Sequence, residues 1–523
     1  MADVIVVGAG PAGLAAAREL APLRPLLLDV GHEAGTGGLP DAPLHQLRLD
    51  RELGAELIGP GFEALHNLER SYLSPKLKAP LMRFITRSPS GAPSVEPEGF
   101  AAVLSYARGG LANAWGAGVF RYDDQDLSGW PVSAAELTPF YDDLTRHIGI
   151  SGVEDDLTPF FGSTADLQPP LPLSRLASRF LGAYQGRRSA MRRRGIHVGR
   201  LRSAILTQDH RGRAAHRIHN QEFFQPNLPG IYHPGYTLDE LRAGGQLEYR
   251  PGALVLRYRE DGDGVTVVAR DQGTGEELTF RCRQLVLAAG ALNTARIALA
   301  SRQDTATRLP LLDNLLSYLP LVDPGLVGAG HEPGAFTGAE LCLVYDGPVT
   351  PDRVQGTFYG LQAPLRGDLF AELPLSLRGN LAALRYLVPA MGMVQLFHPD
   401  RPTAGNEVQL GEGDRLHVRY RRRALGAVER HLIRQFLGAG YLGLRSLVQY
   451  PEPGSSMHYA GGLPMRAEPN GPYQCDRFGR LGGSGRVRVV DGAAFPTLPA
   501  RNHTFTIMAN AARIARDLRQ GPS

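Results

Sequence analysis

A glycine-rich loop near the amino terminus constrains the fold of this chain more than any other feature. Residues 4–7 form an apolar run that predicts a buried parallel strand, and this run leads into Gly8-Ala-Gly10-Pro-Ala-Gly13 and an alanine-rich helix. At this spacing Gly8 makes the tight turn, Gly10 admits a pyrophosphate to the backbone, and Gly13 lets helix and strand pack closely. The helix amino terminus then offers free N–H groups and a positive dipole end to the phosphates. The loop predicts a dinucleotide-binding α/β fold.

A second apolar run supports this interpretation. Leu26–Leu28 ends in Asp29, about twenty residues after the glycines, where an acidic side chain can accept hydrogen bonds from an adenosine ribose. The alternative is that residues 8–13 form a glycine-rich turn that binds no ligand.

Three alternating segments further along the chain bear on the choice between NAD and FAD. Residues 253–258, 265–269 and 278–282 alternate between apolar and polar side chains and are separated by Gly/Asp turns, which predicts an antiparallel meander. The chain then returns through residues 284–290, a second glycine-ended strand, into a helix over 291–300. Such a second unit is typical of FAD proteins rather than of simple NAD dehydrogenases.

Composition excludes several classes of protein. A net charge of +4 over 523 residues does not indicate a nucleic-acid partner, and we expect the clusters 192–194 and 421–423, each of three arginines, to be solvated. The three cysteines are far apart and form no C-x-x-C pair, so neither a disulfide framework nor a metal site is predicted. We see no signal peptide and no apolar run long enough for a membrane span, and we expect a cytoplasmic protein.

Taken together, several segments resemble the glucose-methanol-choline (GMC) oxidoreductase family over most of the chain. They are residues 6–13, 27–31, Arg108-Gly-Gly-Leu-Ala-Asn-Ala-Trp-Gly116, 287–296, Asn314-Leu315 to Pro320, and the region from His458. Residues 124–141 look most like the bacterial branch with pyranose-oxidase-like and sugar-dehydrogenase-like members.

The resemblance implies an α/β fold, α+β overall, with two domains. A Rossmann-like FAD-binding domain of the GMC type would take residues 1–310, discontinuous and with insertions at 41–99 and 131–195, and would be completed by residues 451–523. An antiparallel-sheet substrate domain would take residues 311–450. Its sheet would roof the active site, with Tyr359, Gln395, Phe397 and His398 as roof candidates, although core packing explains each of them equally well.

The same resemblance suggests how the cofactor is held. The loop 109–116 would run along the flavin ring, and Ala114 stands where some relatives attach the flavin through a histidine, so we expect noncovalent FAD. Trp115 is either a core residue or a stacking partner of flavin or substrate. Asp491-Gly492 would approach the ribityl-pyrophosphate, and a helix from Thr504 would point its positive end at the flavin. The candidate cofactor-binding residues are Gly8, Gly10, Ala12, Gly13, Asp29, Val30, Arg108, Gly110, Asn113, Ala114, Trp115, Val255, Ala289, Gly290, Asp491, Gly492 and Thr504.

The candidate catalytic residues are His458, Asn502 and His503. Hydride transfer from an alcohol requires a base for the hydroxyl proton, a role that suits a histidine, and His458 matches the active-site histidine of the family. Asn502 and His503 correspond to the partner residue in different branches, and the sequence does not choose between them.

The predicted function is FAD-dependent oxidation of a small-molecule alcohol, such as a sugar, polyol or secondary metabolite, with oxygen or another electron acceptor. A lyase of the same fold and a flavin-binding protein without turnover are the alternatives. The sequence leaves the substrate, the acceptor and the oligomeric state open.

Overall fold

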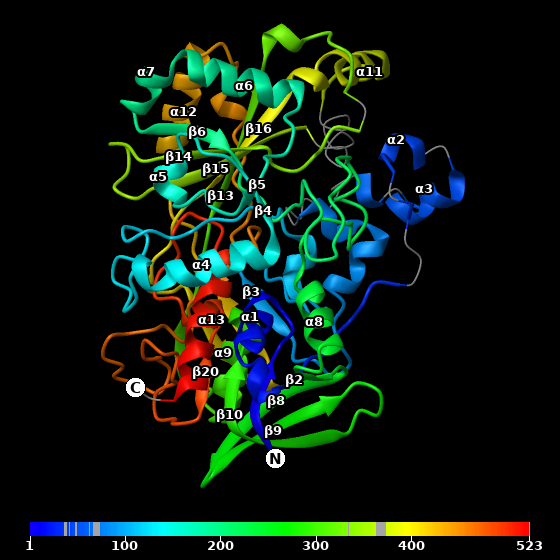
Figure 1. Cartoon of the computed structure of the whole chain (residues 1–523). Helices are drawn as coiled ribbons and strands as arrows, with labels where there is room; N and C mark the ends of the chain where they lie inside the picture. Colours follow the sequence, from blue (N-terminus) through cyan, green and yellow to red (C-terminus); the bar gives the residue numbers. More distant parts are fainter. Residues whose placement is uncertain are drawn as a thin grey trace.

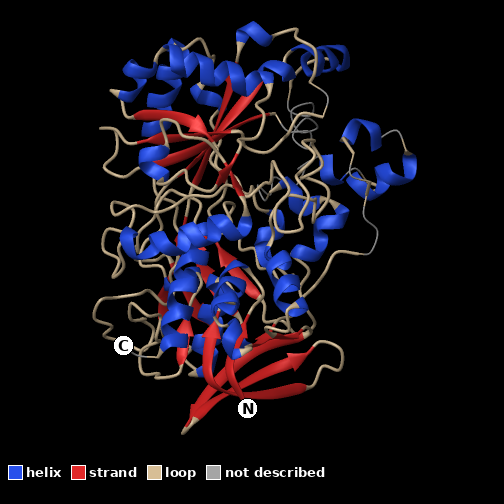
Figure 2. Ribbon diagram, in the orientation of Figure 1, coloured by secondary structure: helices blue, strands red, loops and turns tan. Residues whose placement is uncertain are grey.

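The computed structural model describes residues 1–35, 39–40, 42–47, 50–61, 63–65, 74–332, 334–361 and 373–521. Two sheets dominate the molecule, one toward each end of the view in Figure 1, with helices packed around both. Loops and short helices fill the region between the sheets (Figure 2).

The first sheet has the strand order β7-β2-β1-β10-β9-β8, and β20 also pairs with β10. Strands β1 (Ala2–Val7), β2 (Leu26–Leu28), β7 (Glu248–Arg250) and β20 (Val487–Val489) are parallel to one another and to the end of β10 (Glu277–Leu287). Val7 is level with both Leu28 and Leu287, and Leu287 is level with Val489. The carboxyl ends of these strands therefore meet at one edge, where ligands bind in open parallel sheets.

The predicted meander is part of the same sheet. Strands β8 (Ala253–Asp261), β9 (Gly264–Asp271) and β10 form successive antiparallel pairs, and they project from the lower end of the molecule in Figure 1. β10 is one continuous strand that pairs antiparallel with β9 in its first half and parallel with β1 further on. The chain then enters α9 (Ala291–Ser301), in agreement with the predicted helix.

The second sheet has the strand order β13-β16-β15-β14-β6, and all of its strand pairs are antiparallel. Its strands are β13 (Leu316–Val322), β16 (Met391–Phe397), β15 (Val354–Gly360), β14 (Leu341–Tyr345) and β6 (Ile196–Arg200). The sequence grouped residues 196–200 with the nucleotide-binding part, but β6 pairs with β14 instead. The hydrophobic contacts of α6 (Arg175–Gly186) and α12 (Ala427–Gly438) are with this sheet.

Helices from the two ends of the chain pack together on the first sheet. α1 (Pro11–Glu19) lies against α13 (Thr504–Gln520), and α13 also packs against α4 (Ala134–Ile148). Arg516 of α13 forms an ion pair with Glu19 of α1 at 2.9 Å. The apolar side of α13 faces this core, because Phe505, Met508 and Ile514 are buried.

Smaller elements complete the fold. A mixed sheet has the order β11-β17-β18-β3, and two short pairs join β4 to β5 and β12 to β19. The bounds are β3 (Val95–Glu98), β4 (Ile150–Ser151), β5 (Leu167–Gln168), β11 (Arg308–Pro310), β12 (Leu312–Asp313), β17 (Glu407–Leu410), β18 (Leu416–Arg419), β19 (Tyr459–Ala460), α2 (Leu44–Leu47), α3 (Arg51–Ile58), α5 (Thr158–Phe161), α7 (Arg188–Arg192), α8 (Pro234–Ala243) and α11 (Leu377–Tyr386).

Among the described helices, none combines the length and the apolar character needed to cross a bilayer. Cys282, Cys342 and Cys475 are buried free thiols.

Candidate active site

One long cavity of about 380 Å³ runs from the carboxyl edge of the first sheet to the face of the second. At one end it is lined by the residues that follow β1, β2, β10 and β20, and at the other by side chains of β13, β15 and β16. All three candidate catalytic residues and most of the candidate cofactor-binding residues line it. The cavity therefore joins the two sites that the sequence predicted separately.

The glycine-rich loop has the geometry that its spacing predicted. Gly8 has φ +102°, and a Cβ at this position would collide with the backbone of Ala288. A Cβ at Gly13 would collide with the carbonyl oxygen of Gly8, so the close approach of helix and strand depends on glycine here. A Cβ at Gly10 would meet nothing within 4 Å, because this residue faces the open cavity.

Three helices begin at this cavity without a side-chain cap. They are α1 after Gly10, α9 after Gly290, and α13 after His503, and none of these N-cap residues accepts a backbone N–H through its side chain. The first N–H groups of a helix have no partner within the helix. Together with the helix dipoles, they make the cavity wall favourable to negative charge at three separate points.

Asp29 lies in the cavity wall directly after β2. The carboxylate is partly buried, and the resulting loss of hydration raises its pKa to about 7, although hydrogen bonds from the backbone of Ala9 and from Tyr249 oppose the shift. The Tyr249 hydroxyl is 3.5 Å away, so this hydrogen bond is long. The carboxylate oxygens therefore have capacity for further donors from a ligand.

Three of the candidate cofactor-binding residues are not part of the described cavity lining, namely Gly13, Arg108 and Asn113. Arg108 instead forms ion pairs with Glu33 and Asp239. The amide of Asn113 donates to the carbonyl oxygens of Arg108 and Gly110 at 3.0 and 2.7 Å. Arg108 and Asn113 thus shape the loop 109–116, while Gly110, Ala114 and Trp115 of that loop line the cavity.

Hydrogen bonds to Asp491 connect the turn after β10 to the turn after β20. Its carboxylate accepts from the backbone N–H of Gly290 and Ala493 and from the Thr294 hydroxyl, at 2.8, 2.9 and 2.5 Å. Burial raises the pKa of Asp491 to about 6. Because these contacts occupy the carboxylate, Asp491 acts here as a support that places Gly290 and Gly492 against the cavity.

His458 immediately precedes β19 and lines the cavity. Its Nδ1 is 3.2 Å from Oδ1 of Asn314, and its backbone N–H donates to the Ser456 hydroxyl. The ring of Phe397 stacks on the imidazole at 5.0 Å with an interplanar angle of 19°. Burial, helped by neighbouring His503, holds the pKa of His458 well below its ordinary 6.5.

Asn502 and His503 both reach the cavity, immediately before α13. The rings of His503 and His458 are 4.9 Å apart between centroids. Burial lowers the pKa of His503 to about 4, against an opposing effect of the Tyr459 backbone. The side chain of Asn502 accepts from the Gln355 amide of β15 at 3.3 Å. The structure thus places His458 beside His503, and all three candidates line one cavity.

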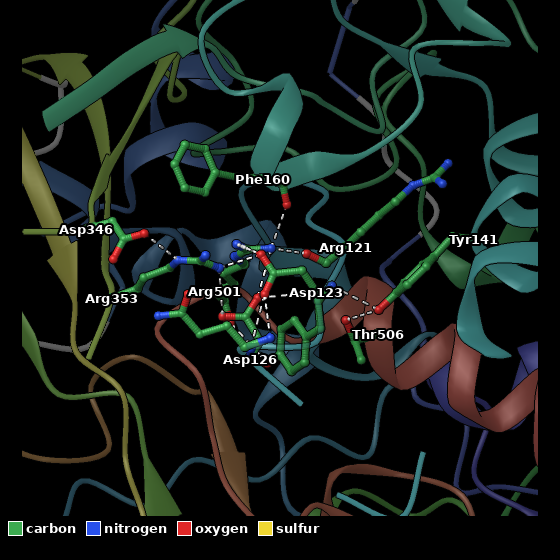
Figure 3. Close-up of polar contacts among 11 residues, drawn as sticks. Arg121, Asp123, Asp126, Tyr141, Phe160, Asp346, Arg353, Arg501 and Thr506 are labelled. Carbon is green, nitrogen blue, oxygen red and sulfur yellow. Dashed lines mark hydrogen bonds and ion pairs between the residues drawn. The ribbon is translucent and has the colours of Figure 1, made fainter. Parts of the chain in front are cut away.

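A partly buried network of charges fixes the chain next to Asn502 and His503 (Figure 3). Arg501 is 2% exposed and forms ion pairs with Asp123 and Asp126 at 3.0 and 2.9 Å. It also donates to the backbone carbonyl oxygens of Arg121 and Phe160. Arg353 binds the same Asp123 and, at 3.2 Å, Asp346. Because Arg353 immediately precedes β15 and Asp346 immediately follows β14, the network connects the second sheet to the Asn502-His503 segment.

The second sheet does form the roof of the cavity. Tyr318, Gln395 and Thr357 lie side by side on β13, β16 and β15 and line it, together with Tyr359 and Phe397. Gln395 connects the hydroxyls of Tyr359 and Tyr318 at 3.3 and 3.4 Å. His398, the fourth roof candidate, is elsewhere: it contacts Ser317 and forms an ion pair with Glu429 of α12 at 3.2 Å.

Trp115 and Lys76 form another part of the wall. The indole N–H donates to the carbonyl oxygen of Tyr232 at 2.9 Å, so Trp115 is held by a hydrogen bond while it faces the cavity. The Lys76 ammonium donates to the carbonyl oxygen of Trp115 at 3.0 Å and lies 5.0 Å from the centroid of the Phe223 ring. Lys76, Gln355 and Asn314 were not candidates. Only Asn314 carried a signal, because it lies in a segment that supports the family resemblance.

A dinucleotide-type sheet and an antiparallel sheet thus enclose one cavity. Comparison with known proteins shows a family match in the carboxy-terminal part of the chain. The model of the GMC oxidoreductase family matches residues 444–511, which include His458, Asn502 and His503.

Two relatives extend this likeness over most of the chain. The chain is 26% identical to the 6'''-hydroxyparomomycin C oxidase of Streptomyces lividus, over 74% of this chain and 71% of the relative. It is 25% identical to the paromamine 6'-oxidase of Streptomyces fradiae, over 88% and 87%. Among solved structures, pyridoxine 4-oxidase from Mesorbium loti matches with a TM-score of 0.59 and 16% identity over the full length of both chains.

The carboxy-terminal part of the chain therefore matches the GMC oxidoreductase family. The chain is an oxidoreductase of the alcohol-oxidising type, as the sequence predicted, and the matched family is generally flavin-dependent.

Proposed function

We propose that this enzyme binds FAD noncovalently and oxidises a sugar-like or polyol-like alcohol to the carbonyl compound. The observation that carries the proposal is the single cavity with two chemically different ends. One end has uncapped helix amino termini and a partly buried carboxylate, and the other has His458 with Asn502 and His503. The first set suits a dinucleotide and the second suits a hydroxyl group.

The residues at the first end fit FAD. The open space at Gly10 would receive the pyrophosphate at the start of α1. Asp29 would accept hydrogen bonds from the adenosine ribose, which would also give its partly buried carboxylate the donors that it lacks in the protein alone. The amino terminus of α13 would stabilise negative charge on the flavin. Ala114 has no nucleophile, which supports noncovalent binding.

Bound FAD would supply the hydride acceptor. The protein must accept the hydroxyl proton, because the alkoxide-like carbon gives up hydride more readily than the neutral alcohol does. His458 is the proposed base. Since its pKa lies well below 6.5, the imidazole is neutral at pH 7 and can accept this proton directly. The alcohol thereby loses one proton and one hydride and becomes a carbonyl compound.

Asn502 and His503 are the proposed partners of His458 around the substrate oxygen. Asn502 could orient this oxygen by a hydrogen bond, since the Gln355 amide restrains its side chain. His503 could in addition share the proton, since its ring lies beside that of His458.

The substrate proposal rests on the roof and on the relatives. Tyr318, Tyr359 and Gln395 present hydroxyl and amide groups to the cavity, which suits a substrate with several hydroxyls. Two relatives are named as oxidases of paromamine or a hydroxyparomomycin. Phe397 would favour a hydrophobic alcohol instead, so the substrate panel must include both kinds. The electron acceptor is oxygen or another carrier, and the three free thiols suit a cytoplasmic enzyme.

Anaerobic addition of an alcohol panel to the purified protein tests the proposal. An oxidoreductase bleaches its flavin, a lyase converts substrate with the flavin unchanged, and a binding protein does neither. We expect His458→Ala to retain FAD and to slow flavin reduction at least about 100-fold. His417→Ala removes an exposed histidine of β18 and is the matched control. Fast reduction in His458→Ala would mean that the base lies elsewhere.

A further inference from the structure

The orientation of the Asn314 side chain follows from its surroundings. Asn314 is fully buried, and its Nδ2 lies 3.0 Å from the carbonyl oxygen of His398 and 3.0 Å from that of Pro499. Carbonyl oxygens only accept hydrogen bonds, so the NH2 group must face them. A flipped amide would place its oxygen against both carbonyls. Asn314 Oδ1 therefore faces His458, as the two carbonyl oxygens on its other side require.

The orientation of Asn314 determines which nitrogen of His458 carries the proton. Oδ1 can only accept, and it is 3.2 Å from His458 Nδ1. In a neutral imidazole one ring nitrogen is a donor and the other an acceptor. Nδ1 must then carry the hydrogen, and Nε2 has the lone pair. The contact joins residues 144 positions apart in the sequence.

Other contacts hold the imidazole in this position. The Ser456 hydroxyl donates to the buried carboxylate of Asp313 at 2.7 Å and accepts the backbone N–H of His458 at 3.0 Å. Asp313 also accepts the backbone N–H of Gly454 at 2.8 Å. Phe397 stacks on the ring. Asp313 and Asn314 are consecutive residues, so one segment fixes both the backbone and the ring of His458.

We propose that Asn314 is a positioning residue that holds His458 in the Nδ1–H tautomer and thereby presents an unprotonated Nε2 to the substrate hydroxyl. This inference rests on the proposed function, because it assumes that His458 is the base. Asn314 itself does not reach the reacting atoms. It contacts the imidazole at Nδ1 and leaves Nε2 free for the substrate. The other tautomer would place a donor where the proton must be accepted, so it could bind the alcohol but could not take its proton.

Nitrogen NMR of the FAD-loaded wild-type enzyme identifies the tautomer of His458 without an activity measurement. Histidine labelled with 15N in the ring distinguishes a protonated from an unprotonated nitrogen, and loss of the signals in His458→Gln assigns them. We expect a protonated Nδ1 and an unprotonated Nε2 for His458 at neutral pH. A protonated Nε2 would overturn the proposal. This measurement needs no variant of Asn314, so it tests the tautomer of His458 even if such variants fold poorly.

Kinetics of two variants test the consequence for the reaction. Asn314→Leu keeps the approximate size of the side chain but removes the acceptor. We expect its flavin reduction at saturating substrate to slow at least about tenfold, as is common when an outer partner of an active histidine is lost, with little change in the apparent substrate dissociation constant. Asn314→Asp keeps an acceptor oxygen toward Nδ1, but its second oxygen must be protonated to face the carbonyl oxygens of His398 and Pro499, so any recovery of the rate should increase as the pH falls. An unchanged rate in Asn314→Leu would overturn the proposal.

Asn406→Leu is the matched control. Asn406 is 4% exposed and its side chain accepts the backbone N–H of Arg421, and it is not among the described residues that line the cavity. Its variant should reduce flavin at the wild-type rate and should leave the His458 signals unchanged. Fast reduction in His458→Ala would refute the proposed function itself. Slow reduction in His458→Ala beside a wild-type rate in Asn314→Leu would refute only the role of Asn314.

Discussion

Replacing Asp29 with asparagine should have separate effects on cofactor binding and on the stability of the apoprotein. Burial raises the pKa of Asp29 from 3.8 to about 7. The folded-state pKa is therefore higher than the unfolded-state pKa, and ionisation of this carboxyl destabilises the folded apoprotein. Its stability should fall as the pH rises from about 4 to about 7.

The pKa difference sets the size of the effect on stability, and the strength of the hydrogen bonds sets the size of the effect on FAD affinity. The pKa difference corresponds to at most about 4 kcal/mol at pH 8, of which about 3 kcal/mol is lost between pH 5 and pH 8. Bound FAD would offset this loss of stability, since each hydrogen bond from the ribose to the charged Asp29 carboxylate contributes about 1.5–3 kcal/mol. Asp29→Asn should therefore weaken FAD binding about 10- to 150-fold and remove this part of the pH dependence.

Two measurements on the apoprotein check the prediction. FAD titration at pH 8 gives the affinity, and urea unfolding at pH 5 and pH 8 gives the stability of both proteins. Asp3→Asn, which changes an exposed carboxylate of β1, is the control and should match the wild type in both. An unchanged FAD affinity in Asp29→Asn would refute the ribose assignment. An unchanged pH dependence of unfolding would refute the buried-charge argument.

Three further predictions concern the cofactor, the catalytic pair and the charged network. Acid or heat denaturation should release FAD into the supernatant because Ala114 cannot bond to it, and yellow colour that stays with the precipitate would contradict this. Asn502→Ala and His503→Ala should slow anaerobic flavin reduction by different factors, the larger marking the true partner of His458, whereas two negligible effects would place the chemistry elsewhere. Arg501→Leu should cost about 3–5 kcal/mol in urea unfolding, because it removes the close partner of buried Asp126 and leaves Asp123 with Arg353 alone, while Arg192→Leu on the exposed surface should cost almost nothing.

Local patterns were sufficient to predict the parts of the fold that form from neighbouring residues. The strand, loop and helix around Gly8–Gly13, the meander and the helices α9 and α13 are all present with nearly the predicted bounds. Each depends on periodicity or on glycine spacing within about twenty residues. In these segments the local preference and the tertiary environment favour the same structure.

Pairings between distant segments could not be predicted in this way. β6 joins β14 across more than a hundred residues, and nothing in residues 196–200 specifies that neighbour. Asn314 meets His458, and Arg501 meets Asp123, through contacts of similar or greater separation. On β16 the alternation of a strand places Gln395 and Phe397 on the cavity side, whereas His398 lies beyond the strand end and contacts α12.

The packing of α1 against α13 has a consequence for synthesis of the enzyme. Arg516 and Glu19, which join these helices, are 497 residues apart. At about 5–20 residues per second, roughly 25–100 s pass between the emergence of the glycine loop and that of its last neighbour. Until then β10 lacks β20, and the cavity lacks the Asn502-His503 wall. The nascent chain therefore lacks part of the wall of the proposed cofactor site, and we expect flavin to bind only after the chain is complete.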